Sequence, residues 1–277
     1  MVMLHMKRSE AEQFLFETTV EAGVQETVAE LVEVNNLRQR IARLKLEGEE
    51  LAKYGPTKPL DKQGIDSYAE EPVKKGPHYN MDPTGRRTGN ACSSQVAQVL
   101  MRTLEEGVAA ASKDQVERRV PLTKHRLSEA VDNIRGAVMI CYPMGLPEWD
   151  FVRQALEANE DLAGTSYGAD DMEADTTSLW FAGKQMVAGK KLSEFLGRNE
   201  KSKVVVKLAR KGQGAPAREP PVDAETQKAM MAMYYKKQEE QKKLAEDEDD
   251  TYTSAAWANP KTLKAAFSGM QNVKFPR

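Results

Sequence analysis

The sequence is poor in cysteine and in aromatic residues, and each shortage excludes a class of protein. Only Cys92 and Cys141 occur in 277 residues, in no C-x-x-C pair and beside no histidine. This excludes a disulfide scaffold and a zinc-finger framework, so we expect two reduced, structural thiols. Aromatic residues make up 6% of the chain and the mean hydropathy is −0.62, which predicts a modest core with much solvated helix.

The chain also lacks an excess of one charge and a long hydrophobic run. Its 40 basic and 42 acidic residues give a net charge of −2, which argues against nucleic acid or an anionic membrane as the partner. The longest apolar stretch, residues 137–146, is interrupted by Pro143 and is too short to cross a bilayer. The first residues lack the pattern of a secretory signal, so we expect a soluble, intracellular chain with no membrane insertion.

Motifs of common catalytic and cofactor sites are missing too. His5, His78 and His125 show no metal-ligand spacing, and neither G-x-S-x-G nor H-E-x-x-H occurs. Residues 183–191 superficially look like a phosphate loop, but five residues separate the glycines instead of four, and Lys191 stands where the magnesium-binding hydroxyl belongs. We therefore expect a protein that is not an enzyme and has no cofactor or metal.

Hydrophobic periodicity divides the first third of the chain into strands, helix and loop. Alternating runs at residues 2–7 and 13–17 predict a β-hairpin. Helical spacing begins at Val24, and a second helical period follows from residue 37 to about residue 53. Residues 55–90 hold five of the thirteen prolines and no sustained period, which predicts a loop or an extended wrap.

The middle of the chain predicts mostly helices. Amphipathic periods indicate helices around residues 96–104 and 127–134. The apolar run at residues 137–142 predicts a buried strand or an extended segment, and a third helix is expected around residues 148–157. A strand pattern returns later and is clearest at residues 203–208.

The last part of the chain is a linker, a charged helix and an aromatic tail. After the linker at residues 212–221, a helix is expected near residues 223–246, with Met230 and Met233 on one side. An acidic run at residues 246–250 precedes the tail. Methionine and aromatic side chains are frequent in protein interfaces, so Met230, Met233, Trp257 and Phe267 are candidate partner-binding residues. The alternatives are simple solvation for the acidic run and folding of Trp257 back onto the domain.

Residues 179–195 resemble the part of ubiquitin from its third strand to its fifth, notably in FAGKQ at 181–185. In ubiquitin this half follows a hairpin and one amphipathic helix, the order that residues 1–36 supply. A hairpin and one helix cannot bury enough surface alone, so distant strands must cover the helix. The resemblance implies an α+β fold with a discontinuous ubiquitin-like β-grasp domain, a long insertion and a C-terminal helical extension. The parts are the β-grasp domain at 1–36 and 175–211, the mainly helical insertion at 37–174, and the extension at 212–277.

The same resemblance suggests a binding surface on the outward face of the sheet. Trp180 falls where ubiquitin carries the isoleucine of its recognition patch, and Val206 is a candidate neighbour, so both are candidate partner-binding residues. The alternative is that Trp180 packs against the insertion, because apolar sheet faces in elaborated folds are often covered. The chain continues past Gly212, so conjugation through a free diglycine terminus is not expected.

Blocks spread over nearly the whole chain resemble the Kurly family of cilia- and flagella-associated proteins. They are GRRTGN at 85–90, GAVMICYPMGLP at 136–147, GRNEKSK at 197–203 and GQGAPAREP at 212–220, with residues 1–8 and 249–264. Membership implies a role in ciliary motility through cytoplasmic assembly of axonemal dynein arms, with a related role in cilium positioning and planar polarity.

The resemblance also implies protein partners and a location. The partners are dynein-arm assembly factors, chaperones or axonemal dynein subunits. The location is the cytoplasm, the cilium or flagellum, and the basal body. The alternative is a structural component of the axoneme, bound to microtubule-associated complexes.

Overall fold

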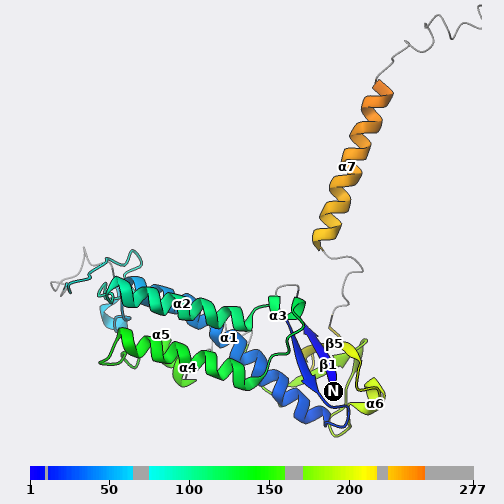
Figure 1. The fold of residues 1–277 in the computed structure, drawn as a ribbon, viewed down its shortest axis with the longest axis horizontal. Coiled ribbons are helices and arrows are strands. Elements are labelled where there is room, and N and C mark those ends of the chain that lie inside the picture. The colour runs from blue at the N-terminus through cyan, green and yellow to red at the C-terminus, as the bar shows by residue number, and fades with distance from the viewer. Residues whose placement is uncertain (10–11, 65–74, 160–170, 217–223, 247–277) are drawn as a thin grey trace, which may run out of the picture. The chain divides into compact units, whose positions relative to one another are not determined.

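The computed structural model describes residues 1–9, 12–64, 75–159, 171–216 and 224–246. The chain divides into two compact units, residues 1–217 and 218–277, and the second contains helix α7 (Ala224–Glu246). The first unit combines a mixed β-sheet with a bundle of helices (Figure 1). The expectation of an α+β fold is therefore confirmed.

The sheet contains five strands in the order β2-β1-β5-β3-β4. β1 and β5 run parallel, with Met3 opposite Lys203 and Met6 opposite Val206, while the other neighbouring pairs are antiparallel. Strands from the two ends of the first unit thus share one sheet, as the sequence predicts. The strands are β1 (Val2–Lys7), β2 (Gln13–Thr18), β3 (Thr177–Phe181), β4 (Lys184–Gln185) and β5 (Lys203–Arg210).

Side chains alternate across β1 and β5, and this alternation corrects one predicted site residue. Leu4 and Met6 of β1 are completely buried, and Val204 and Val206 of β5 belong to the same hydrophobic core. The placement of Val206 on the outward face is therefore wrong by one residue. Since successive side chains of a strand point to opposite faces, Val205 points outward instead, and it is 44% exposed.

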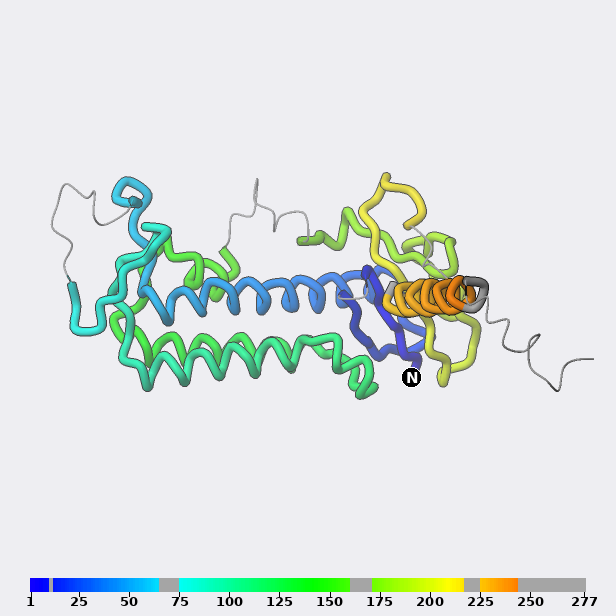
Figure 2. The backbone as a smooth tube through the Cα atoms, turned by 90° about the horizontal axis from the view of Figure 1, so that it is seen from above, coloured from blue at the N-terminus to red at the C-terminus, as the bar shows by residue number. Residues whose placement is uncertain are grey.

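Helix α1 (Val24–Tyr54) is shared by the sheet and the helical bundle. The two successive helical periods of the sequence form one helix of 31 residues, which is about 46 Å long at 1.5 Å per residue. Its first half lies against the sheet and its second half runs beside α2 and α4 (Figures 1 and 2). The expected boundary between the β-grasp domain and the insertion, at residue 36, falls inside this helix.

Three long helices make the bundle, and each contacts the other two: α1, α2 (Ser94–Ala111) and α4 (Lys124–Cys141). The helices α1 and α2 approach closely at Gly48, where an added Cβ would lie 2.8 Å from Leu104 Cδ1. The shorter helices of this unit are α3 (Asp114–Glu117), α5 (Phe151–Glu157), α6 (Ser193–Leu196) and a 3-10 helix (Leu60–Lys62).

The prediction of a buried strand at residues 137–142 is wrong, because residues 137–141 complete α4. Val138 and Cys141 are buried, whereas Met139 and Ile140 are exposed, as expected for a helix with one solvated side. The helix predicted at residues 148–157 forms as α5 and begins later, at residue 151. Its start is fixed by Asp150, whose side chain accepts a hydrogen bond from the amide of Val152 at 2.9 Å.

The predicted loop after α1 is held in place by a buried arginine, Arg87. Its side chain is 1% exposed and pairs with Glu47 Oε2 at 2.7 Å and Glu50 Oε2 at 3.3 Å, both near the end of α1. It also lies 3.9 Å from Asp150 Oδ2, just before α5. Arg87 therefore connects the loop to two helices, and its acidic partners compensate the burial of its charge.

The buried side chain of Asp82 also fixes the conformation of this loop. Burial acts to raise its pKa, but hydrogen bonds from the backbone amides of Thr84 and Arg87 and from the Thr84 hydroxyl outweigh this and hold the pKa below its usual value. The loop is therefore built around the charged form of this carboxyl group.

Replacing Arg87 by methionine should destabilise the protein strongly. Arg87→Met removes the buried cation that faces Glu47 and Asp150, so we expect a loss of about 3 kcal/mol in the free energy of unfolding, measured by denaturant titration. The matched control is Arg86→Met, because the Arg86 side chain is 38% exposed and reaches Glu47 and Glu50 only at 3.5 and 4.0 Å. That variant should lose less than about 1 kcal/mol. Equal losses from both variants would contradict the role given to Arg87.

The register of β5 can be tested with two neighbouring valines. Val206→Asp places a charge in the core and should cost about 4 kcal/mol or more, whereas Val205→Asp should change stability by no more than about 1 kcal/mol. Thermal unfolding of the two variants measures the difference. A greater loss from Val205→Asp would show that the other face of β5 is the buried one.

Candidate functional site

The outward face of the sheet collects several of the residues that the sequence singles out. We define the outer sheet face as Met3, His5, Trp180, Val205 and Lys207, which share a side of three neighbouring strands. Trp180 lies opposite Lys207, and His5 lies opposite Val205. The Trp180 indole Nε1 donates a hydrogen bond to Ser178 Oγ at 3.1 Å, and its ring is half-buried. The outer sheet face is therefore partly buried and leaves Val205 exposed.

Helix α7 carries the other two described candidates. Met230 and Met233 are 60% and 76% exposed and stand three positions apart along the helix, so they lie near one another on its surface. Met231, Tyr234 and Tyr235 are exposed as well. A cluster of five large side chains is unusual on a solvated helix and is typical of a binding segment. Helix α7 belongs to the second unit.

The remaining two candidates, Trp257 and Phe267, lie outside the residues that the structure describes. The acidic residues at 247–250 do so too. These predictions therefore stay predictions.

The sequence analysis missed a further set of exposed apolar side chains. They belong to the loop after α1, the end of α4, the segment that follows it and the start of α5, which lie at the end of the bundle away from the sheet (Figure 1). Met144 is fully exposed and Leu60 is 83% exposed. The indole Nε1 of Trp149 donates to the carbonyl oxygen of Thr57 at 3.0 Å, which anchors the ring while part of it stays exposed. We call this group the distal surface; its members are Leu60, Met139, Ile140, Met144, Trp149 and Phe151.

A cation stacks on one member of the distal surface. The guanidinium carbon of Arg86 lies 5.2 Å from the centre of the Phe151 ring, within the range of a cation–π contact. The backbone next to this arginine is also fixed, since Arg86 O accepts a hydrogen bond from the amide of Lys58 at 2.8 Å. The loop after α1 and the start of α5 are therefore joined at this contact.

The distal surface escaped sequence analysis for a physical reason. A strand at residues 137–142 would bury its apolar side chains, whereas the helix that forms there exposes Met139 and Ile140. The signal that could have revealed it is the length of the apolar run at residues 137–142. Six consecutive residues of a helix point to all sides, so some of them must be exposed.

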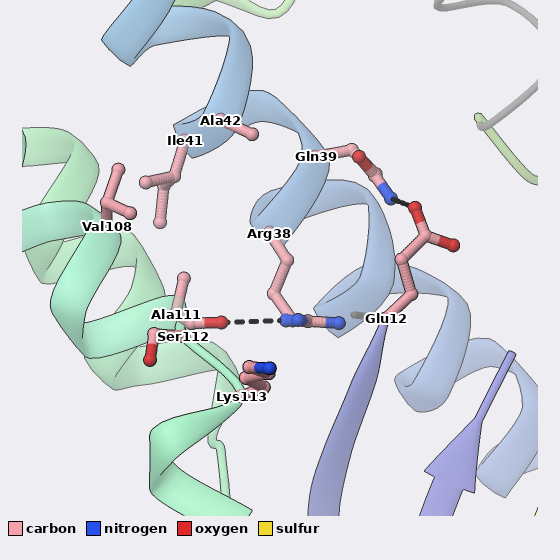
Figure 3. A pocket seen from close by; sticks show the side chains of 9 residues that line it. All are labelled: Glu12, Arg38, Gln39, Ile41, Ala42, Val108, Ala111, Ser112 and Lys113. Atoms are coloured by element: carbon pink, nitrogen blue, oxygen red, sulfur yellow. Dashed lines mark hydrogen bonds between the residues drawn. The ribbon is translucent and has the colours of Figure 1, made fainter. Parts of the chain in front are cut away.

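A small cavity lies between α1 and the end of α2 (Figure 3). Its volume is about 240 Å³, below the usual range for small-molecule sites. The Arg38 Nε donates to Ala111 O at 3.0 Å and its guanidinium carbon lies 5.0 Å from the Phe14 ring centre, while Gln39 donates to Glu12 Oε1 at 3.2 Å. Burial lowers the pKa of Arg38, and Glu12 acts in the opposite direction. These side chains hold the two helices and the start of β2 together.

Neither a metal cluster nor a membrane-spanning helix is found in the part of the chain that the structure describes. No group of three His, Cys, Asp or Glu side chains there could hold a metal ion, and no helix there is long and apolar enough to cross a bilayer.

Comparison with known proteins gives the family. The chain is 43% identical to cilia- and flagella-associated protein 298-A of Xenopus laevis, 41% identical to cilia- and flagella-associated protein 298 of Homo sapiens, and 36% identical to that of Drosophila melanogaster. Each comparison covers 99% of both chains. No solved structure matches the chain.

The family model described as cilia- and flagella-associated protein 298 matches residues 177–273, which include β3, β5 and α7. The family name supports an association with the cilium or flagellum. The full-length similarity and the model match agree with the Kurly resemblance of the sequence blocks. The chain therefore belongs to the cilia- and flagella-associated protein 298 family.

Proposed function

We propose that this protein is a non-enzymatic, protein-binding factor of motile cilia and flagella that acts in the cytoplasmic assembly of axonemal dynein arms. A related role in cilium positioning and planar polarity belongs to the same proposal. Its partners are dynein-arm assembly factors, chaperones or axonemal dynein subunits, and it resides in the cytoplasm, at the basal body and in the cilium. The membership of the family supports the ciliary part of this proposal.

The observation that carries the protein-binding role is the distal surface. Exposed apolar side chains on a monomeric protein are normally scattered, and a group of six at one end of a bundle indicates an interaction site. The backbone beneath it is rigid, because Arg87 and Asp150 fix the loop and the start of α5. A partner that binds there therefore meets a preformed surface and does not have to order it.

We further propose that residues 1–36 and 175–211 form a discontinuous ubiquitin-like β-grasp domain. The support is the sheet order β2-β1-β5-β3-β4, with a hairpin and then a helix at its start and a parallel β1–β5 pair at its centre. In this proposal the outer sheet face, with Trp180 and Val205, is a second binding surface, and Met230 and Met233 of α7 are a third.

A charge-introducing double variant tests the distal surface. Ile140→Lys with Met144→Lys changes two exposed side chains, so the melting temperature should stay within about 2 °C of the wild type, a change typical of surface substitutions in a domain of this size. Capture of dynein-arm assembly factors from ciliated-cell cytoplasm should fall at least about tenfold, a loss of about 1.4 kcal/mol of binding free energy. Cells that carry only this variant should build fewer dynein arms, counted in electron micrographs of axoneme cross-sections.

The control is Val187→Lys, which introduces one lysine at an exposed apolar position beside β4, away from the distal surface. This variant should bind partners and support dynein-arm assembly like the wild type. Full activity of the double variant, or an equal loss in the control, would contradict a specific role for the distal surface.

The alternative is a structural component of the axoneme, and extraction of isolated cilia separates the two. An assembly factor should remain largely in the cell body and be released from cilia by detergent. Retention in the axoneme after detergent and high salt, at a fixed ratio to dynein, would favour the structural alternative instead.

A further inference from the structure

The two cysteines lie together in the fold although they are far apart in the sequence. Cys92 is in the segment just before α2, and Cys141 is the last residue of α4. The Cys141 Sγ donates to the carbonyl oxygen of Val96, in the first turn of α2, at 3.7 Å. Cys92 packs against the hydrophobic core to which Cys141 belongs, the two thiols are within reach of a side-chain hydrogen bond, and both are free. A chain with only two cysteines thus brings both to one place.

The two thiols differ in their access to solvent. Cys92 is half-buried, whereas Cys141 is buried. Burial, together with the neighbouring Cys92, raises the pKa of Cys141 to about 12, so this thiol stays protonated at neutral pH. An oxidant dissolved in water therefore reaches Cys92 first, and Cys141 is placed to react only with what forms on Cys92.

We propose that Cys92 and Cys141 are an oxidation-sensitive pair that closes to an intramolecular disulfide when the protein meets hydrogen peroxide. The Cys92 thiolate attacks a peroxide oxygen, the O–O bond breaks, and a sulfenic acid and one water form. The Cys141 sulfur then bonds to the Cys92 sulfur and displaces hydroxide, which leaves with the Cys141 proton as a second water. Two thiols and one peroxide give one disulfide and two waters.

The disulfide would join the ends of two helices at a place where a third is already attached. Tyr142, next to Cys141, donates through its hydroxyl to Leu51 O of α1 at 3.1 Å, and burial raises the pKa of this phenol. The new bond closes a ring from residue 92 to residue 141, which contains α2, α3 and α4, and thereby restricts the unfolded chain. Met139 and Ile140 of the distal surface lie in the same turn as Cys141, so the link would rigidify that turn. This inference does not depend on the proposed function.

The test uses the purified full-length protein, treated with graded hydrogen peroxide and then digested without reductant. We expect a peptide pair linked through Cys92 and Cys141, an intact mass lower by two hydrogen atoms, and full reversal by dithiothreitol. The oxidised protein should also melt several degrees higher than the reduced protein.

Two variants divide the reaction into its steps. Cys141→Ser removes the resolving thiol, so a sulfenic acid should persist on Cys92 and be trapped by dimedone. Cys92→Ser should leave Cys141 unmodified at the same peroxide dose, because that thiol is buried. The proposal is overturned if the wild type forms only disulfide-linked dimers or only sulfinic acid at Cys92, or if Cys141 is oxidised equally fast in Cys92→Ser.

Discussion

The first unit depends on helix α1, which is buried against two different parts of the structure. The first half of α1 covers the sheet, and its second half packs against α2 and α4. A hairpin alone and a helix alone are both marginal in water, so each part of the fold needs the surface that α1 provides. Because α1 has no break, Leu4 of the sheet and Ile134 of the bundle belong to one continuous hydrophobic core. The insertion is thus not an independent module attached to a finished sheet.

The sequence predicts those elements whose side chains meet water on one side and the core on the other. The hairpin, α1 and the shared sheet of β1 and β5 are confirmed for this reason. The prediction fails where the pattern has no period. Residues 137–142 are apolar without a gap, and only contacts from distant segments decide between strand and helix. The register of β5 is lost in the same way, because three consecutive valines at 204–206 show no alternation.

Sequence patterns predict the candidate binding residues less well than they predict the fold. Arg86 and Arg87 are adjacent and chemically identical, yet one guanidinium stacks on an exposed phenylalanine and the other is buried among carboxylates. Their difference arises from the direction of the backbone and not from composition. Trp180, Met230 and Met233 could be chosen from the sequence because large side chains in polar surroundings are visible there. The distal surface is harder to choose, because the apolar run at residues 137–142 indicates only that some of its side chains are exposed in a helix, and the tertiary packing of α4 decides that these are Met139 and Ile140.

Because α1 is unbroken, it fixes the distance between the two ends of the first unit. The outer sheet face and the distal surface belong to the opposite ends of a unit built on this helix, whose axis extends about 46 Å. In the proposed function, a partner assembly whose two contact points match this distance binds more tightly through both surfaces, because the second contact forms at a high effective concentration. An assembly with a different interval gains from only one. Two individually weak contacts can in this way distinguish the correct partner assembly from similar ones, because α1 fixes the distance between the two surfaces.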